Sequence, residues 1–251
     1  MPKKLGDELL RHQDVVEDTS WYDDWIVPSG NLDRRSRSAY RLSNTDCMAR
    51  VLVTGFEPFA QSSFNPSEAI LREFPAWVGP KQARLHIHRL RTDFEVSGRQ
   101  IVSLVKRICP EKILLLGLAE DRDGICLERL ALNLDDSSIP DNRGVIRHGR
   151  PILRKGPAAY FSTAPVDSLC KRLSKKGVPV AISNHAGTFV CNHVYFKALH
   201  CINAFSLPCQ CLLVHLPETG RPGKKVPLGT APWTDVCQWV KHVYVEYLRH
   251  K

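Results

Sequence analysis

From Arg50 onward, the spacing of hydrophobic positions changes repeatedly along the chain. Short apolar runs bounded by glycine, proline or charged residues are typical of buried strands, and apolar residues three or four apart predict helices. We expect strands at 51–54, 85–90, 113–118, 127–134, 178–183 and 210–217. We expect helices at 65–74, 94–108, 166–176, from 191 onward and at 234–249. This alternation predicts an α/β fold: a single three-layer α/β/α domain with a mixed, largely parallel twisted sheet.

The first 47 residues differ from this pattern. They show no sustained period of 2 or 3.6, and they contain two of the chain's five tryptophans, Trp21 and Trp25. Met48 directly precedes the first strand-like run. We therefore expect residues 1–47 to be an N-terminal extension that is poorly ordered or not native, and residues 48–251 to form the single folded domain. Our hypothesis is that Met48 is the natural start, and N-terminal sequencing of protein made from its native gene tests it.

Composition narrows the class of protein. With 251 residues, 43% of them hydrophobic, the chain can bury a full core in one domain. No apolar stretch approaches the roughly 20 residues of a membrane span, so we expect no membrane partner. No apolar run follows the opening Met-Pro-Lys-Lys, so we expect no secretory signal. Nine cysteines without a Cys-x-x-Cys pair indicate reduced thiols in a cytoplasmic protein.

The charge and the cysteine spacing argue against two further classes of site. The net charge is +9, but the basic residues are scattered, and no basic surface motif with interleaved aromatic residues accompanies them. We therefore expect no nucleic-acid partner. Cys209 and Cys211 are too close for the usual structural zinc pattern, so we expect no metal ion.

Cys191 is the strongest candidate for chemistry. It follows the turn-forming residues 186–188 and a short apolar step, at the predicted beginning of a helix. Unpaired backbone N–H groups and the positive end of the helix dipole stabilise a thiolate there, and the thiolate is the nucleophile. The alternative is an inert buried cysteine at a strand-to-helix joint.

Two other residues are candidate partners of this cysteine. His215 stands at the C-terminal end of a short buried strand, where open α/β sheets place functional groups. Glu128 stands near the start of another strand-like run. Glu128, Cys191 and His215 have the chemistry of an orienting carboxylate, a nucleophile and a base. Each also has a structural explanation, as an exposed glutamate, a core cysteine and a hydrogen-bonded histidine, and the sequence alone does not bring them together.

The order of five blocks adds to this pattern. The blocks are 51–59, 65–67, 128–133 leading to 139–142, 156–162 and 186–193, with His215 in a His-Leu-Pro at a strand end. Over residues 48–250 the chain resembles the type I pyroglutamyl peptidases, also called pyrrolidone-carboxylate peptidases. The resemblance implies a cysteine peptidase that removes N-terminal pyroglutamyl residues from peptides through a thioester. It implies Cys191 as nucleophile, His215 as base, Glu128 as third member, no cofactor, and a homo-oligomer, commonly a tetramer.

The resemblance also implies a substrate pocket. A pyroglutamyl group is a small uncharged lactam, so its pocket should be apolar with a few aimed polar groups. Main-chain groups near Leu118 are implied to pair with the lactam amide. The implied walls are Phe56, Phe59, Thr92, Ile139, Phe189 and Val190. Phe56 and Phe59 also fit the simpler interpretation of core aromatic residues.

Two departures from the family pattern keep other functions open. Ser138 stands where bacterial members generally carry an arginine that helps to stabilise the oxyanion, and a basic loop, 218–225, follows the histidine strand. One alternative function is a cysteine amidase that acts on another lactam or acyl amide. The other is a pyroglutamyl-peptide-binding homologue with little or no turnover.

Overall fold

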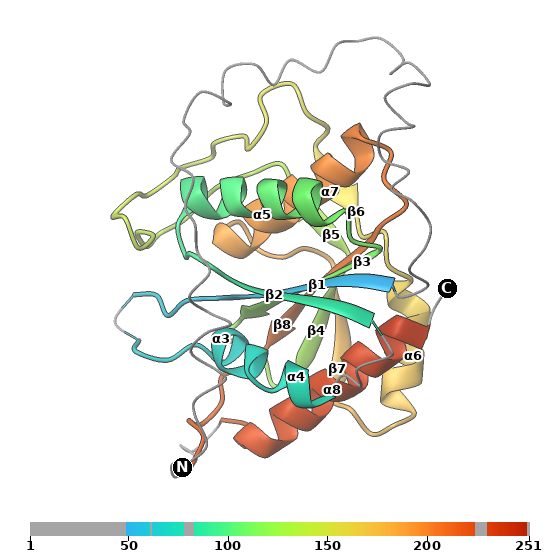
Figure 1. The fold of residues 1–251 in the computed structure, drawn as a ribbon. Helices are drawn as coiled ribbons and strands as arrows, with labels where there is room; N and C mark the ends of the chain where they lie inside the picture. Colours follow the sequence, from blue (N-terminus) through green and yellow to red (C-terminus); the bar gives the residue numbers. More distant parts are fainter. Residues whose placement is uncertain (1–48, 61, 78–82, 224–229, 250–251) are drawn as a thin grey trace, which may run out of the picture. The chain divides into compact units, whose positions relative to one another are not determined.

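The computed structural model describes residues 49–60, 62–77, 83–223 and 230–249. The prediction for residues 1–47 lies outside this part of the chain. The described residues belong to one compact unit, which carries all the elements considered below (Figure 1).

Six strands form the central sheet, in the order β2-β1-β3-β8-β4-β7. Neighbouring strands are parallel except β4 and β8, which are antiparallel, so the sheet is mixed and largely parallel as expected. A second sheet pairs β5 (Leu130–Leu132) with β6 (Ala159–Phe161). The strands of the central sheet are β1 (Ala49–Phe56), β2 (Ala83–Leu90), β3 (Lys112–Leu118), β4 (Ile125–Glu128), β7 (Val180–Ser183) and β8 (Gln210–Leu216).

Helices cover both faces of the central sheet and confirm the three-layer prediction (Figure 1). One face packs against α5 (Phe94–Ile108) and α7 (Val190–Ala204). The other face packs against α3 (Pro66–Leu71), α4 (Phe74–Trp77), α6 (Val166–Ser174) and α8 (Trp233–Arg249).

Successive side chains of a strand point to opposite faces of the sheet and pack into two separate cores. In β3, Ile113 and Leu115 lie in the core beneath α5 and α7, and Leu114 and Leu116 lie in the core on the opposite face. All four side chains are fully buried. A strand buried on both faces needs apolar residues at every position, which explains the continuous apolar run in the sequence.

Most predicted elements are present with shifted ends. The helix at 94–108 has the predicted bounds, because Asp93 caps its first turn through a 2.6 Å hydrogen bond to the Val96 N–H. The predicted strand 127–134 is instead two strands, β4 and β5. The chain passes from one sheet to the other at Arg129, whose N–H donates to the Ser183 carbonyl and whose carbonyl accepts from the Ser162 N–H.

A long segment without helix or strand, residues 133–158, joins β5 to β6; we call it the arm. Both the amide and the carbonyl of the Asn133 side chain hydrogen-bond to the backbone of Leu153, each at 2.8 Å. Asp135 and Arg150 form a backbone bridge further out. These bonds replace the ladder of a regular sheet and fix the course of the arm.

Candidate active site

Glu128 and His215 meet where β4 and β8 lie side by side. Glu128 is the last residue of β4, and His215 is the penultimate residue of β8. The Nδ1 atom of His215 lies 2.7 Å from Oε1 of Glu128, and both side chains are buried. The thiol of Cys191 lies beside the His215 ring: a Cβ atom built on Gly117 would be 3.0 Å from Sγ of Cys191 and 3.1 Å from Nε2 of His215. The three candidate residues for chemistry are therefore brought together in the order carboxylate, imidazole, thiol.

The surroundings of His215 favour its protonated form. Burial by itself lowers the pKa of the imidazole, but the hydrogen bonds and charges of Cys191 and Glu128 outweigh burial and raise the pKa of His215 to about 10. A histidine held between a carboxylate and a thiol in this way is suited to form an imidazolium–thiolate pair.

Cys191 is the second residue of α7, as the sequence predicts. Phe189 is the N-cap residue and supplies no side-chain hydrogen bond to the first turn. The N–H groups of a first turn have no partner within the helix, so they are available to a negative charge at this helix start. The next residue, Asn192, fixes the helix in place: its amide donates to the carbonyls of Leu132 and Leu134, and its side-chain oxygen accepts from the Leu132 N–H.

A cavity of about 320 Å³ opens beside the thiol. Five of the seven residues predicted for substrate binding line it together with Cys191 and His215: Phe56, Phe59, Thr92, Leu118 and Phe189. Ile139 and Val190 are not among the lining residues. Val190 is fully buried in the core under α7, and Ile139 lies on the arm with 42% of its surface exposed. The sequence pattern did not distinguish residues near the cavity from those that line it.

Aromatic rings form the apolar wall of the cavity. The ring centroid of Phe189 lies 5.9 Å from that of Phe59 and 5.4 Å from that of Phe94, the latter in an edge-to-face arrangement. Such pairs hold one another in orientation through their quadrupoles. Because Phe189 directly precedes α7, this packing also fixes the backbone that leads to Cys191.

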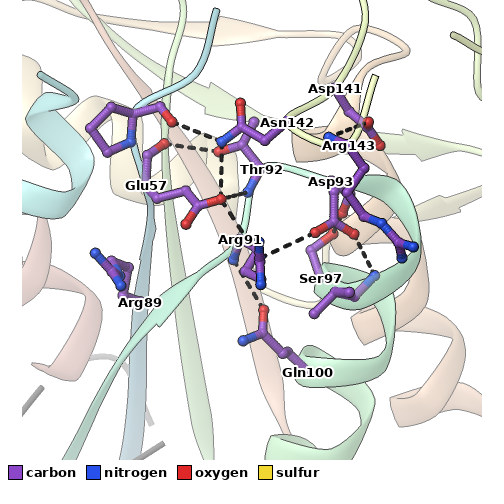
Figure 2. Close-up of polar contacts among 12 residues, drawn as sticks. Glu57, Arg89, Arg91, Thr92, Asp93, Ser97, Gln100, Asp141, Asn142 and Arg143 are labelled. Carbon is purple, nitrogen blue, oxygen red and sulfur yellow. Dashed lines mark hydrogen bonds and ion pairs between the residues drawn. The ribbon is translucent and has the colours of Figure 1, made fainter. Parts of the chain in front are cut away.

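Glu57, which the sequence did not single out, is the centre of a polar network beside the cavity (Figure 2). Its Oε1 atom accepts from the Thr92 N–H at 3.1 Å and from the Asn142 amide at 2.9 Å. Its carbonyl oxygen accepts from the Thr92 hydroxyl at 2.8 Å and from the Asn65 amide at 3.2 Å. Glu57 thus joins the end of β1, the end of β2, the start of α3 and the arm.

A carboxylate on the arm, Asp141, reaches α5. Asp141 accepts from the Phe94 N–H through one oxygen, and from the N–H groups of Arg143 and Val145 through the other. The Asn142 N–H donates to the Thr92 carbonyl. Asp141 and Asn142 therefore hold the arm to the start of α5 and to the segment after β2 (Figure 2).

A buried histidine–carboxylate pair lies apart from the cavity. Nδ1 of His193 lies 2.9 Å from Oδ2 of Asp135, which also pairs with Arg147. Burial lowers the pKa of His193, against the opposing effect of Asp135. Since neither His193 nor Asp135 lines the cavity, the pair ties α7 to the arm.

Five further polar residues line the cavity that were not predicted as site residues: Asn65, Asp121, Arg122, His185 and Thr188. Among the described residues, no three His, Cys, Asp or Glu side chains are grouped so as to hold a metal ion. In the same residues, no helix combines the length and apolar character that a membrane crossing requires.

Comparison with known proteins agrees with this geometry. A family model described as pyroglutamyl peptidase matches residues 49–225. The pyrrolidone-carboxylate peptidase of Pectobacterium carotovorum is 39% identical over 193 residues, which are 73% of this chain and 89% of that protein. Pyrrolidone-carboxylate peptidase 2 of Photorhabdus laumondii is 38% identical over 175 residues, which are 66% of this chain and 76% of that protein.

Solved structures extend the likeness to the fold. Pyroglutamyl peptidase I of Bacillus amyloliquefaciens superposes with a TM-score of 0.71 at 32% identity, over 80% of this chain and 98% of that one. The pyrrolidone carboxyl peptidase of Thermococcus litoralis superposes with a TM-score of 0.71 at 31% identity, over 81% of this chain and 94% of that one. The chain belongs to the pyroglutamyl peptidase family of cysteine peptidases.

Proposed function

We propose that this protein is a cysteine omega-peptidase that removes the N-terminal pyroglutamyl residue of peptides, with Cys191 as nucleophile, His215 as acid and base, and Glu128 as the carboxylate that orients the imidazole. The observation that carries the proposal is the continuous series of contacts from Glu128 to His215 to Cys191 at an apolar cavity.

The reaction follows from these contacts. The Cys191 thiolate attacks the pyroglutamyl carbonyl carbon; the S–C bond forms while the carbonyl electron pair moves to oxygen. The backbone N–H of Cys191, at the start of α7, donates to this oxyanion. When the oxyanion collapses, the C–N bond breaks and the departing amine takes the proton of His215. His215 then deprotonates a water molecule, which hydrolyses the thioester and releases pyroglutamate.

The cavity suits an uncharged lactam. Phe56, Phe59 and Phe189 offer apolar surface to the ring methylenes, and Leu118 ends β3 at the cavity, where main-chain groups can pair with the lactam amide. The Thr92 hydroxyl proton is already donated to the Glu57 carbonyl. In our proposal Thr92 therefore contributes its methyl group and a lone pair, and not a donor.

Two further features belong to the same proposal. We infer a cytoplasmic protein, since the cysteines in the described residues are free thiols. We also infer a homotetramer, as the family resemblance implies. Size-exclusion chromatography with light scattering tests the assembly, and a monomer in solution would contradict it.

A pair of chromogenic substrates tests the activity. Purified protein should hydrolyse a pyroglutamyl arylamide, and iodoacetamide should abolish this hydrolysis. The matched prolyl arylamide, which lacks the lactam carbonyl, should remain intact. Tight binding of the pyroglutamyl aldehyde without hydrolysis would instead indicate a binding protein. Hydrolysis of other acyl amides with neither of these would indicate a different amidase.

A further inference from the structure

Arg122 lies in the active-site cavity, and the reaction as described leaves it unused. It lines the same cavity as Cys191 and His215. Among the described residues that line this cavity, it alone carries a permanent positive charge. Its position is therefore relevant to any negative charge that forms there.

Backbone bonds hold Arg122 near the catalytic strand. The Arg122 N–H closes a turn on the Ala119 carbonyl at 3.3 Å. The Ala119 N–H donates at 2.9 Å to the carbonyl of Leu216, the residue after His215. The turn that carries Arg122 is thus anchored to β8 one residue beyond the proposed base.

The charge of Arg122 acts on Cys126, which is paired with His215. This pair lies across the antiparallel β4 and β8, so the two side chains share one face of the sheet. Burial raises the pKa of the Cys126 thiol, and the positive charge of Arg122 opposes this rise. The guanidinium therefore acts on the residue that pairs with His215, and Arg122 and His215 line the same cavity.

The guanidinium of Arg122 has donors that are free to bind a ligand. Its Nε atom is buried and has no hydrogen-bond partner among the described residues. Its ion pair is with Asp121, at 3.5 Å, and the Asp121 side chain is 78% exposed, so water screens this pair. By contrast, Arg129 is engaged by Asn184 and Asp167, and Arg147 by Asp135.

No residue of the arm lines the cavity, so the arm places no charged side chain there. Ser138, on the arm, is exposed and does not line the cavity. The remaining donor at the helix start is the neutral N–H of Cys191. A charged donor aimed at the developing oxyanion contributes more than a neutral one.

We propose that Arg122 is a catalytic residue whose guanidinium donates to the substrate carbonyl oxygen as negative charge develops on it. This proposal rests on the proposed function. In the acylation step Arg122 neither gains nor loses a proton; it stabilises the electron pair that moves from the C=O bond to oxygen. When that pair re-forms the C=O bond and the amine leaves, the guanidinium returns to its ion pair with Asp121.

Kinetics of Arg122→Met and Arg122→Lys test this role. Methionine keeps much of the apolar stem without the charge, and lysine keeps the charge without the planar fork. Arg122→Met should lower kcat on the order of 10²-fold with little change in KM, because the lost interaction forms only in the transition state. Arg122→Lys should retain an intermediate rate. The control is Arg249→Met, which removes an exposed arginine paired with Glu246 and should leave kcat unchanged.

Two ligands separate a catalytic role from a structural one. The pyroglutamyl aldehyde forms a hemithioacetal with Cys191, whose oxygen takes the place of the oxyanion, whereas free pyrrolidone occupies the lactam pocket alone. Arg122→Met should weaken aldehyde binding in proportion to kcat/KM and leave pyrrolidone binding and Tm unchanged. An unchanged kcat, or an equal loss of both affinities, would overturn the proposal. If the parent protein hydrolyses no pyroglutamyl amide, the proposed function fails, and the two affinities still decide the role of Arg122.

Discussion

A Cβ atom on Gly117 would lie 3.0 Å from Sγ of Cys191. The same atom would lie 2.9 Å from Cδ2 and 3.1 Å from Nε2 of His215, which faces Gly117 across the β3–β8 pair. Carbon atoms at such distances are in steric conflict with both partners. The absence of a side chain at Gly117 is therefore what allows the thiol and the imidazole to meet.

Gly117→Ala should separate Cys191 from His215. We expect a loss in kcat on the order of 10²-fold, because a displacement of about 1 Å in a reacting pair has that effect. Leu116→Ala is the matched control, since Leu116 lies on the opposite face of the same strand. It should lower stability by about 2–5 kcal/mol and leave kcat of the folded protein unchanged. Full kcat in Gly117→Ala would show that the contact is not needed.

The raised pKa of His215 predicts the alkaline limit of activity. The pKa is about 10 in the folded chain against an ordinary 6.5, so the imidazolium persists through neutral pH and is lost as pH rises toward 10. Folding stabilises the protonated ring; this contribution to stability is complete below pH 6.5 and disappears as pH approaches 10. Glu128→Gln removes one cause of the shift, so the alkaline limb of the kcat/KM profile should move to lower pH and kcat should fall. An unmoved limb would exclude Glu128 as a cause.

Iodoacetamide should modify Cys191 before the four cysteines whose thiols are desolvated by burial. Desolvation raises the pKa of Cys201 to about 11 and that of Cys209 and Cys237 to about 12, and raises the pKa of Cys211 well above its usual value. Their thiols stay protonated and react slowly at neutral pH. Peptide mass mapping after brief labelling should find Cys191 modified before these four. Cys191→Ala should abolish turnover, whereas Cys201→Ala should lower stability only.

The helices were the most predictable part of the fold. The apolar period and the flanking Asp93 and Pro110 define the helix at 94–108, and the structure has the same bounds. The predicted strand 127–134 was wrong as one element, because Arg129 changes partner from one sheet to the other. Such a change depends on long-range pairing and leaves no mark on the local period.

Individual candidate residues were predictable, and their arrangement was not. The contact between Glu128 and His215 joins residues 87 apart in sequence. It arises because β8 lies between β3 and β4, an order that periodicity does not encode. The pairing of Glu57 with Asn142 was not predicted for a related reason. It is a hydrogen bond to the arm, and the sequence of the arm has no repeating pattern of apolar and polar residues.

Glu57 should determine substrate affinity more than the rate of the chemical step. Glu57→Ala removes the acceptor for the Thr92 N–H and the Asn142 amide, so the cavity wall should loosen. We expect KM to rise severalfold with kcat nearly unchanged, the result of losing binding common to the ground and transition states. Glu57→Gln keeps an oxygen acceptor of the same reach and should restore most of the affinity. Equal losses of kcat in both variants would show that the charge of Glu57 takes part in the chemistry.

Ser138→Arg tests whether a cation on the arm can stabilise the oxyanion. Ser138 is exposed, so a long cation there can extend without being buried, and Tm should not change. If the new guanidinium reaches the oxyanion, kcat should rise while KM stays constant, because the added donor acts on charge that forms in the transition state. The rise should be larger in the Arg122→Met background than in the parent, since the two arginines then serve the same oxygen and their effects are not additive. A lower kcat at unchanged Tm would show that position 138 does not serve the oxyanion in this protein. A lower Tm would show that the arm around Ser138 is built for a small hydroxyl side chain.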